Sequence, residues 1–181
     1  MEMRKIIKFL FISLGSLLAL SLSGCTSHPP GDLLILLQAD KTPGGLEIKY
    51  EVVNVSDGPI YIESGKRMPY LELEGRTLTL RYSVHPEPGV DYIMFELPEL
   101  TKIDKGKSLA RTVTLPFPVN DSNHFDGVLD KLNIRPGELK IQMEMGYGLT
   151  PFPLTESTAI MREFLDWQRL TLSPIVAVTI Q

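Results

Sequence analysis

Short segments in which apolar and polar side chains alternate recur along most of this chain. Residues 46–52 are the clearest case, because their apolar side chains share one face of an extended chain and their charges take the other. A period of two residues is typical of a β-strand with one buried and one solvated face. Further short β-rich runs, separated by Gly, Pro, Asn and Asp, lie at residues 33–37, 60–62, 71–74, 78–82, 92–97, 112–115, 139–145 and 176–180.

Eight or nine short strands with few helical patterns between them indicate an all-β fold, built as one domain over residues 32–181. Gly75-Arg76 predicts a tight hairpin between two of the strands. The pattern is similar to that of immunoglobulin-like modules of secreted bacterial proteins, which implies a two-sheet antiparallel sandwich; a small barrel is the alternative. One short helix is predicted near the C-terminus at residues 158–168, and a weaker helical pattern lies at 125–132.

The amino terminus has the pattern of a secretory signal. Three basic residues, Arg4, Lys5 and Lys8, precede an almost unbroken apolar run over residues 9–22. Basic residues before a short apolar run are typical of a signal helix that is removed on export. The run has 14 residues, whereas a permanent transmembrane helix needs about 20.

The apolar run ends in Leu22-Ser23-Gly24-Cys25, which resembles the lipobox of bacterial lipoproteins. The resemblance covers residues 1–25 and implies cleavage between Gly24 and Cys25, with fatty acyl chains such as palmitate on Cys25. Residues 1–24 would then be a signal peptide and residues 25–31 a lipidated cysteine with a short tether. In Gram-negative lipoproteins, an Asp directly after the cysteine resembles an inner-membrane retention signal. This chain has Thr26 at that position, which favours the outer membrane. The alternative is a plain secretory signal with a chance cysteine.

Charge indicates how the mature chain meets a membrane. Removing residues 1–24 leaves 15 basic and 21 acidic residues, a net charge of −6 on 157 residues. An acidic surface disfavours nucleic acid and anionic lipid, so the covalent lipid on Cys25 is expected to provide the membrane association. Because Cys25 is the only cysteine, no intramolecular disulfide can form.

No sequence motif supports catalysis, a metal or a cofactor. His85 is expected at an exposed strand end, and His124 lies in a polar loop with Ser122 and Asp126 that matches neither a catalytic triad nor a calcium loop. The carboxylates of Glu72 and Glu74 lie two residues apart on one strand, which predicts a solvated face. We therefore expect no catalytic residues, no metal and no cofactor.

Three aromatic residues are the candidates for a binding surface. Phe117 and Phe152 lie in loops flanked by prolines, and Trp167 falls outside the apolar stripe of the predicted helix. Rigid, exposed aromatics are common anchors for partners, whereas the alternative is that all three pack against the core. The sequence predicts a membrane-anchored, non-catalytic lipoprotein that binds a protein partner or supports the envelope, with a small-ligand-binding lipoprotein as the alternative.

Overall fold

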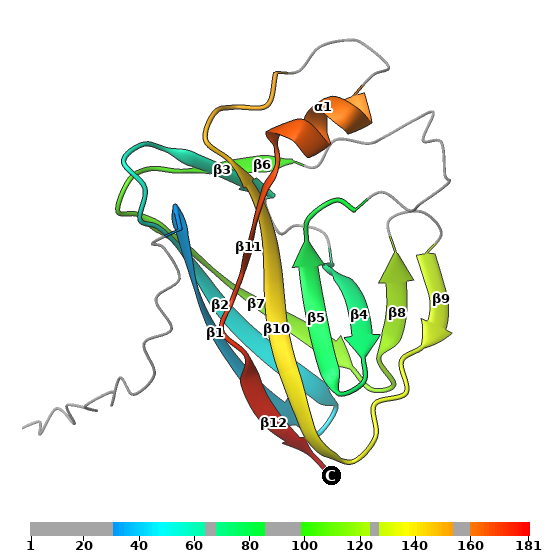
Figure 1. The fold of residues 1–181 in the computed structure, drawn as a ribbon. Coiled ribbons are helices and arrows are strands. Elements are labelled where there is room, and N and C mark those ends of the chain that lie inside the picture. Colours follow the sequence, from blue (N-terminus) through cyan, green and yellow to red (C-terminus); the bar gives the residue numbers. More distant parts are fainter. Residues whose placement is uncertain (1–30, 64–67, 86–98, 124–126, 154–159) are drawn as a thin grey trace, which may run out of the picture.

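The computed structural model describes residues 31–63, 68–85, 99–123, 127–153 and 160–181 (Figure 1). Most of the described chain is β-strand, with one short helix near the C-terminus. The elements are β1 Leu33–Thr42, β2 Gly45–Asn54, β3 Ile60–Glu63, β4 Tyr70–Glu74, β5 Thr77–Tyr82, β6 Leu100–Ile103, β7 Ser108–Pro116, β8 Asn120–Asn123, β9 Gly127–Lys131, β10 Gly137–Gly148, α1 Ile160–Trp167, β11 Arg169–Leu172 and β12 Val176–Ile180. The prediction of an all-β fold with one short helix is confirmed.

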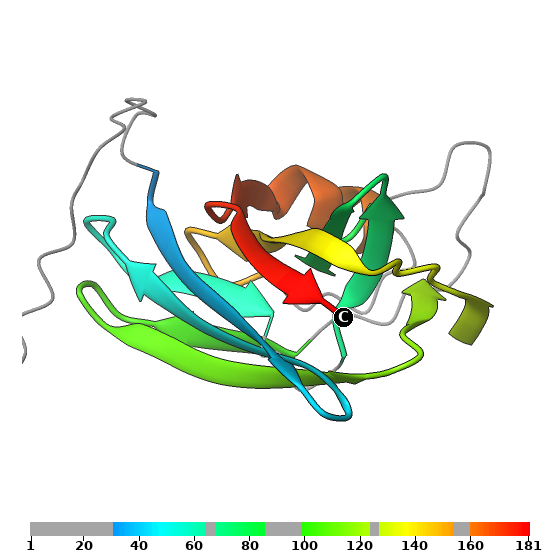
Figure 2. The ribbon, with the colours of Figure 1, turned by 90° about the horizontal axis from the view of Figure 1, so that it is seen from below.

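The strands form two sheets that face each other (Figure 2). Sheet A has three antiparallel strands in the order β1-β2-β7, and sheet B has nine strands built around β10. The longest strand of sheet B, β10, pairs with β5 and β3 on one side and with β12 and β11 on the other. The predicted arrangement of two sheets is confirmed at this level.

One strand pair corrects the prediction of a purely antiparallel sandwich. β5 runs parallel to β10, with Leu78 opposite Ile141 and Tyr82 opposite Met145. Parallel neighbours need a long connection, and the chain between these two strands also contains β6 to β9. Alternation within a strand cannot reveal the direction of its neighbour, because both directions place every second side chain on the same face.

The core lies between the sheets and is built by the alternating runs. The inward side chains of β2 illustrate this: Leu46, Ile48 and Val52 are fully buried and Tyr50 is 3% exposed. From sheet B, β5 and β10 contribute the facing residues Leu78, Leu80, Tyr82, Leu139, Ile141, Met143, Met145 and Tyr147. The predicted hairpin is also present, with Gly75 at φ 60° between β4 and β5.

Several segments differ from the sequence-based prediction. Residues 127–131 form strand β9 and not a helix, and β6, β8 and β11 were not predicted. These strands have four or five residues each, too few for a clear period. The predicted strand at 92–97, His124 with Asp126, and the amino-terminal segment through Cys25 lie outside the described residues. In the described part of the chain, no helix is long and apolar enough to span a membrane.

Candidate functional site

The structure places two of the three candidate aromatics in a cluster beneath α1. Phe152 is only 6% exposed, and its ring centroid lies 5.3 Å from that of Phe164 and 5.8 Å from that of Trp167. The indole Nε1 of Trp167 donates a hydrogen bond to the carbonyl oxygen of Thr150 at 2.7 Å. Phe117 lies elsewhere, half-buried against the main core. In the isolated chain Phe152 therefore packs and does not protrude, which is the alternative that the sequence left open.

Two glycines on β10 let the end of α1 lie flat on sheet B. A Cβ at Gly148 would lie 2.0 Å from the indole of Trp167, and a Cβ at Gly146 would lie 2.4 Å from the amide oxygen of Gln168. That amide in turn accepts a hydrogen bond from the backbone N–H of Val84 at 2.9 Å and donates to its carbonyl at 3.0 Å. The helix end is thus attached to both β10 and the end of β5.

A polar network lies next to this attachment, on the face of sheet B that points away from the core. Glu144 of β10 accepts hydrogen bonds from the Ser83 hydroxyl and from Nε2 of His85. The Ser83 Oγ and His85 Nε2 atoms are 3.1 Å apart. Arg81 extends the network, because its guanidinium lies 3.8 Å from Glu144 and 2.5 Å from Glu72. His85 is therefore engaged with a carboxylate 59 residues away, which its expected exposed position did not indicate.

This serine, histidine and glutamate do not have the geometry of a catalytic triad. In a triad the acid binds one imidazole nitrogen and the nucleophile the other, so that the histidine can accept the proton of the nucleophile. Here Ser83 and Glu144 both meet Nε2 of His85, and the serine hydroxyl also donates to the same carboxylate oxygen. The arrangement holds the chain after β5 against β10. Among the described residues, no group of three or more His, Cys, Asp or Glu side chains is suited to a metal ion.

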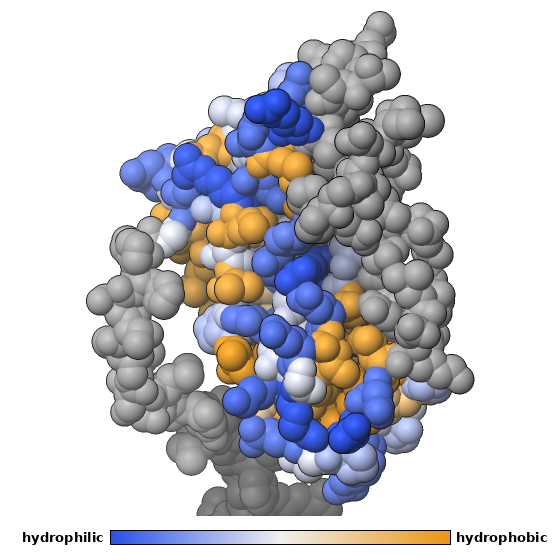
Figure 3. Space-filling view, turned by 45° about the vertical axis from the view of Figure 1, so that its right-hand side comes forward, coloured by the Kyte–Doolittle hydropathy of each residue, from blue (hydrophilic) through white to orange (hydrophobic). Residues whose placement is uncertain are grey.

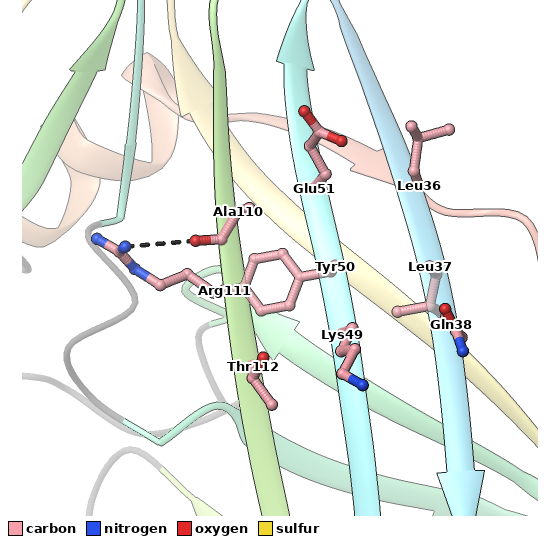
Figure 4. Close-up of a pocket in the computed structure, with 9 residues that line it drawn as sticks. All are labelled: Leu36, Leu37, Gln38, Lys49, Tyr50, Glu51, Ala110, Arg111 and Thr112. Carbon is pink, nitrogen blue, oxygen red and sulfur yellow. Dashed lines mark hydrogen bonds between the residues drawn. The ribbon is translucent and has the colours of Figure 1, made fainter. Parts of the chain in front are cut away.

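The outer face of sheet A carries a shallow hollow of about 670 Å³ (Figure 4). The strand register arranges most of its lining in two rows across β1, β2 and β7. The upper row is Leu36, Glu51 and Ala110, and the lower row is Gln38, Lys49 and Thr112. Residues of the row between these two, Leu37, Tyr50 and Arg111, complete the lining, which therefore combines apolar and aromatic residues with two cations and one anion.

The apolar part of this face is open to solvent. Leu36 is 49% exposed, and Leu34, one row further along β1, is 44% exposed. Lys49 lies on the middle strand of the hollow, and its hydrogen bond to Glu47 raises the pKa of its ammonium group above the ordinary value. Sequence reasoning did not identify this surface, because residues 33–37 read as one apolar run with no outward face.

Comparisons of the chain with protein-family models, with curated proteins and with solved structures find no match.

Proposed function

We propose that the protein is a membrane-anchored lipoprotein whose β-sandwich binds a protein partner in the cell envelope without catalysing a reaction. The anchoring half depends on one observation, the sequence Leu22-Ser23-Gly24-Cys25 directly after a 14-residue apolar run. Two or three acyl chains on Cys25 hold a protein in a bilayer far better than one chain does. Thr26 after the cysteine favours the outer membrane.

For the fold we propose an immunoglobulin-like sandwich. Two facing sheets around one core support this description. The parallel β5–β10 pair and the nine strands of sheet B would be departures from the plainest form of that architecture.

The partner-binding half depends on the outer face of sheet A. Exposed Leu34 and Leu36 border a hollow that also contains Lys49 and Glu51. Protein interfaces have this mixed character, with apolar contacts inside a polar rim. Among the described strands, β1 pairs on one side only, so a partner can also add a strand at that edge.

The absence of catalysis is part of the proposal and has one geometric support. Among the described residues, a hydroxyl, an imidazole and a carboxylate come together at Ser83, His85 and Glu144. Nε2 of His85 contacts both the serine and the carboxylate there, whereas a catalytic triad uses a different imidazole nitrogen for each.

Mass spectrometry of the amino-terminal peptide tests the anchor. The protein is purified from membranes, and we expect its first residue to be Cys25 with acyl chains attached. A Cys25→Ser variant should be released from the membrane or left unprocessed. A chain that begins at Met1, or an unmodified thiol on Cys25, contradicts the proposal.

Site-directed photo-crosslinking tests the partner surface. A photoreactive amino acid replaces Leu36 or Thr112 on the outer face of sheet A, and Thr179 on β12 of sheet B as a matched exposed control. We expect both sheet A positions to give an adduct of the same mass in intact membranes and Thr179 to give none. Leu36→Asp should abolish the adduct formed from position 112. Equal adducts from position 179, or an adduct that survives Leu36→Asp, would show that this face is not the partner surface.

A further inference from the structure

A second hollow, of about 490 Å³, lies between the β4–β5 turn and the segment that leads into β10. Its floor is formed by Leu73, Ile134 and Leu139, and its rim by Arg76, Asn133 and Arg135. Figure 3 shows a group of apolar side chains bordered by polar ones in the lower part of the view. The hollow is thus apolar inside and cationic at its edge.

The floor is an extension of the main core. Leu139 is 2% exposed, and Leu73 and Ile134 pack against the same cluster from neighbouring segments. Leu73 and Leu139 both belong to the inward-facing sets of their strands, opposite Leu78 and Val178. An apolar chain that entered the hollow would therefore lie against side chains that are already held in place.

The two arginines at the rim are placed by backbone contacts. Arg76 donates hydrogen bonds from Nε to the carbonyl of Glu138 at 2.5 Å and from Nη2 to the carbonyls of Arg135 and Pro136 at 3.3 Å. Gly137, at φ 112°, leaves room for this guanidinium, since a Cβ there would lie 3.0 Å from Nη2. Arg76 thereby fixes the segment that presents Arg135.

Positive charge at this rim has no counter-charge within the described part of the chain. Neither Arg76 nor Arg135 forms an ion pair there. Glu74 and Glu138 are close in sequence, but each alternates with an inward leucine, so its side chain lies on the opposite face of sheet B. The rim is therefore complementary to an anion.

We propose that this hollow binds an amphipathic anion: a carboxylate or phosphate head group at Arg76 and Arg135, with a short apolar chain over Leu73, Ile134 and Leu139. Because Nε and Nη2 of Arg76 donate to backbone carbonyls, its Nη1 and the guanidinium of Arg135 are the groups that would donate charge-assisted hydrogen bonds to a carboxylate or phosphate. This site lies beyond the proposed function and on a different part of the molecule from the hollow of sheet A.

The position of the tether favours an anion that arrives from solution. Asp32, where the tether joins the domain, contacts Tyr147 near the end of β10 at 3.3 Å. The hollow lies at Leu139, eight residues back along the same strand, which is about 26 Å at 3.3 Å per residue. A lipid head group and a free amphiphile share the same chemistry, so the test includes both sources.

Photolabelling of the full-length protein in phosphatidylcholine nanodiscs tests the site. The probe is octanoate with a diazirine at the end of its chain, and labelled peptides are mapped by mass spectrometry. We expect label in the peptides that contain Leu73 and Ile134. Unlabelled octanoate should compete, whereas 1-octanol, which lacks the charge, and acetate, which lacks the chain, should not. Competition by added phosphatidylglycerol vesicles identifies a lipid as the source, and competition by octanoate alone identifies a free amphiphile.

Two variants separate the charge from the fold. Arg135→Gln removes an exposed cation without removing a hydrogen bond given above, and it should weaken competition by octanoate about tenfold. Arg162→Gln, at an exposed position of α1 and at the end of the fold opposite the β4–β5 turn (Figure 1), is the matched control and should leave competition unchanged. Equal competition by 1-octanol, label outside the two peptides, or no effect of Arg135→Gln would overturn the proposal. None of these outcomes bears on the acylation of Cys25 or on the crosslinks from sheet A.

Discussion

At the scale of single residues, Gly148 determines how closely α1 approaches sheet B. The indole of Trp167 occupies the space that a side chain at position 148 would need. The same indole is held by a hydrogen bond to Thr150 and by contacts with Phe152 and Phe164. A residue without a side chain is therefore required at this point of β10.

Gly148→Ala should lower the free energy of unfolding by about 1–3 kcal/mol, because the added methyl group overpacks against a fixed ring. Urea unfolding measures the change. Trp167 is the only tryptophan, so a red shift of its fluorescence in the native state would report its displacement. Gly58→Ala is the matched control, since a Cβ there meets nothing within 4 Å. An equal loss in both variants would show that the Trp167 contact is not the cause.

The buried tyrosines predict a loss of stability at alkaline pH. Burial raises the pKa of Tyr82 and of Tyr50 above the ordinary value of 10.0, so both stay neutral in the folded state. Above a pH of about 10 the unfolded chain loses these protons and the folded chain does not, so the free energy of unfolding falls as pH rises.

Urea unfolding between pH 8 and pH 11 should show this fall, and Tyr82→Phe should make it shallower. The Tyr82 hydroxyl is buried beside that of Tyr50, which contributes to its raised pKa, but it forms no well-aligned hydrogen bond among the described residues. Its removal should therefore change the free energy of unfolding at pH 7 by only about 1 kcal/mol. A slope that is unchanged by Tyr82→Phe would exclude this tyrosine as a source of the pH dependence.

At the scale of elements, α1 is joined to the sheets through Trp167 and also through the residue that follows it. The Gln168 side chain satisfies both backbone groups of Val84, which is 2% exposed. An eight-residue helix is too short to be stable by itself in water, so its position depends on such tertiary contacts.

Gln168→Ala should cost about 1–3 kcal/mol, because it leaves buried backbone groups of Val84 without partners. Hydrogen exchange of the Val84 amide should become faster than in the wild type. Gln38→Ala removes an exposed hydrogen bond to Asp40 and serves as the control. An unchanged exchange rate at Val84 would mean that the Gln168 contact does not protect it.

The open edge of β7 is the second feature at this scale. Its nine residues pair only with β2 among the described strands. Arg111 lies opposite Tyr50, so its position on β7 belongs to the inward-facing set. The residue is nevertheless exposed. A charge at such a position on an edge strand opposes pairing with another chain.

Arg111→Thr should therefore promote self-association, detected as a concentration-dependent sedimentation coefficient in detergent. Lys140→Thr removes a charge from β10, which is paired on both sides at Thr77 and Ala177, and should remain monomeric. Equal association of the two variants would indicate that the loss of a positive charge is the cause, and that the position of Arg111 on the edge strand is not.

At the scale of the whole molecule, net charge and the proposed anchor act in opposite senses. Without the proposed signal peptide, residues 1–24, the chain has a net charge of −6 by composition, which disfavours adsorption to an anionic bilayer. Any stable membrane association must then be hydrophobic, through the acyl chains proposed for Cys25.

Membranes washed with about 1 M NaCl should retain the protein, and detergent should release it. At this salt concentration the Debye length is about 3 Å, so electrostatic attraction to the bilayer is screened. The Cys25→Ser variant gives the comparison for a chain that lacks the anchor. Release of the wild type by salt would show that its association is electrostatic. Fractionation followed by immunoblotting measures both.

The sequence by itself determined the all-β class, most of the long strands, the inward residues of β2 and the helix near the C-terminus. These features depend on local periodicity, because one-sided burial imposes a two-residue repeat on a strand whatever its neighbours are. The outward face of β1 was missed because residues 33–37 form one apolar run without a two-residue repeat. The very short strands were missed because they have too few residues to show a repeat.

Only the tertiary structure decided which segments meet. The parallel pairing of β5 with β10, the contact of His85 with Glu144, the packing of Phe152 under α1 and the hollow beside Arg135 all join residues that are distant in sequence. Such contacts result from how the buried faces of whole sheets fit together, and a repeat within one strand carries no information about that fit.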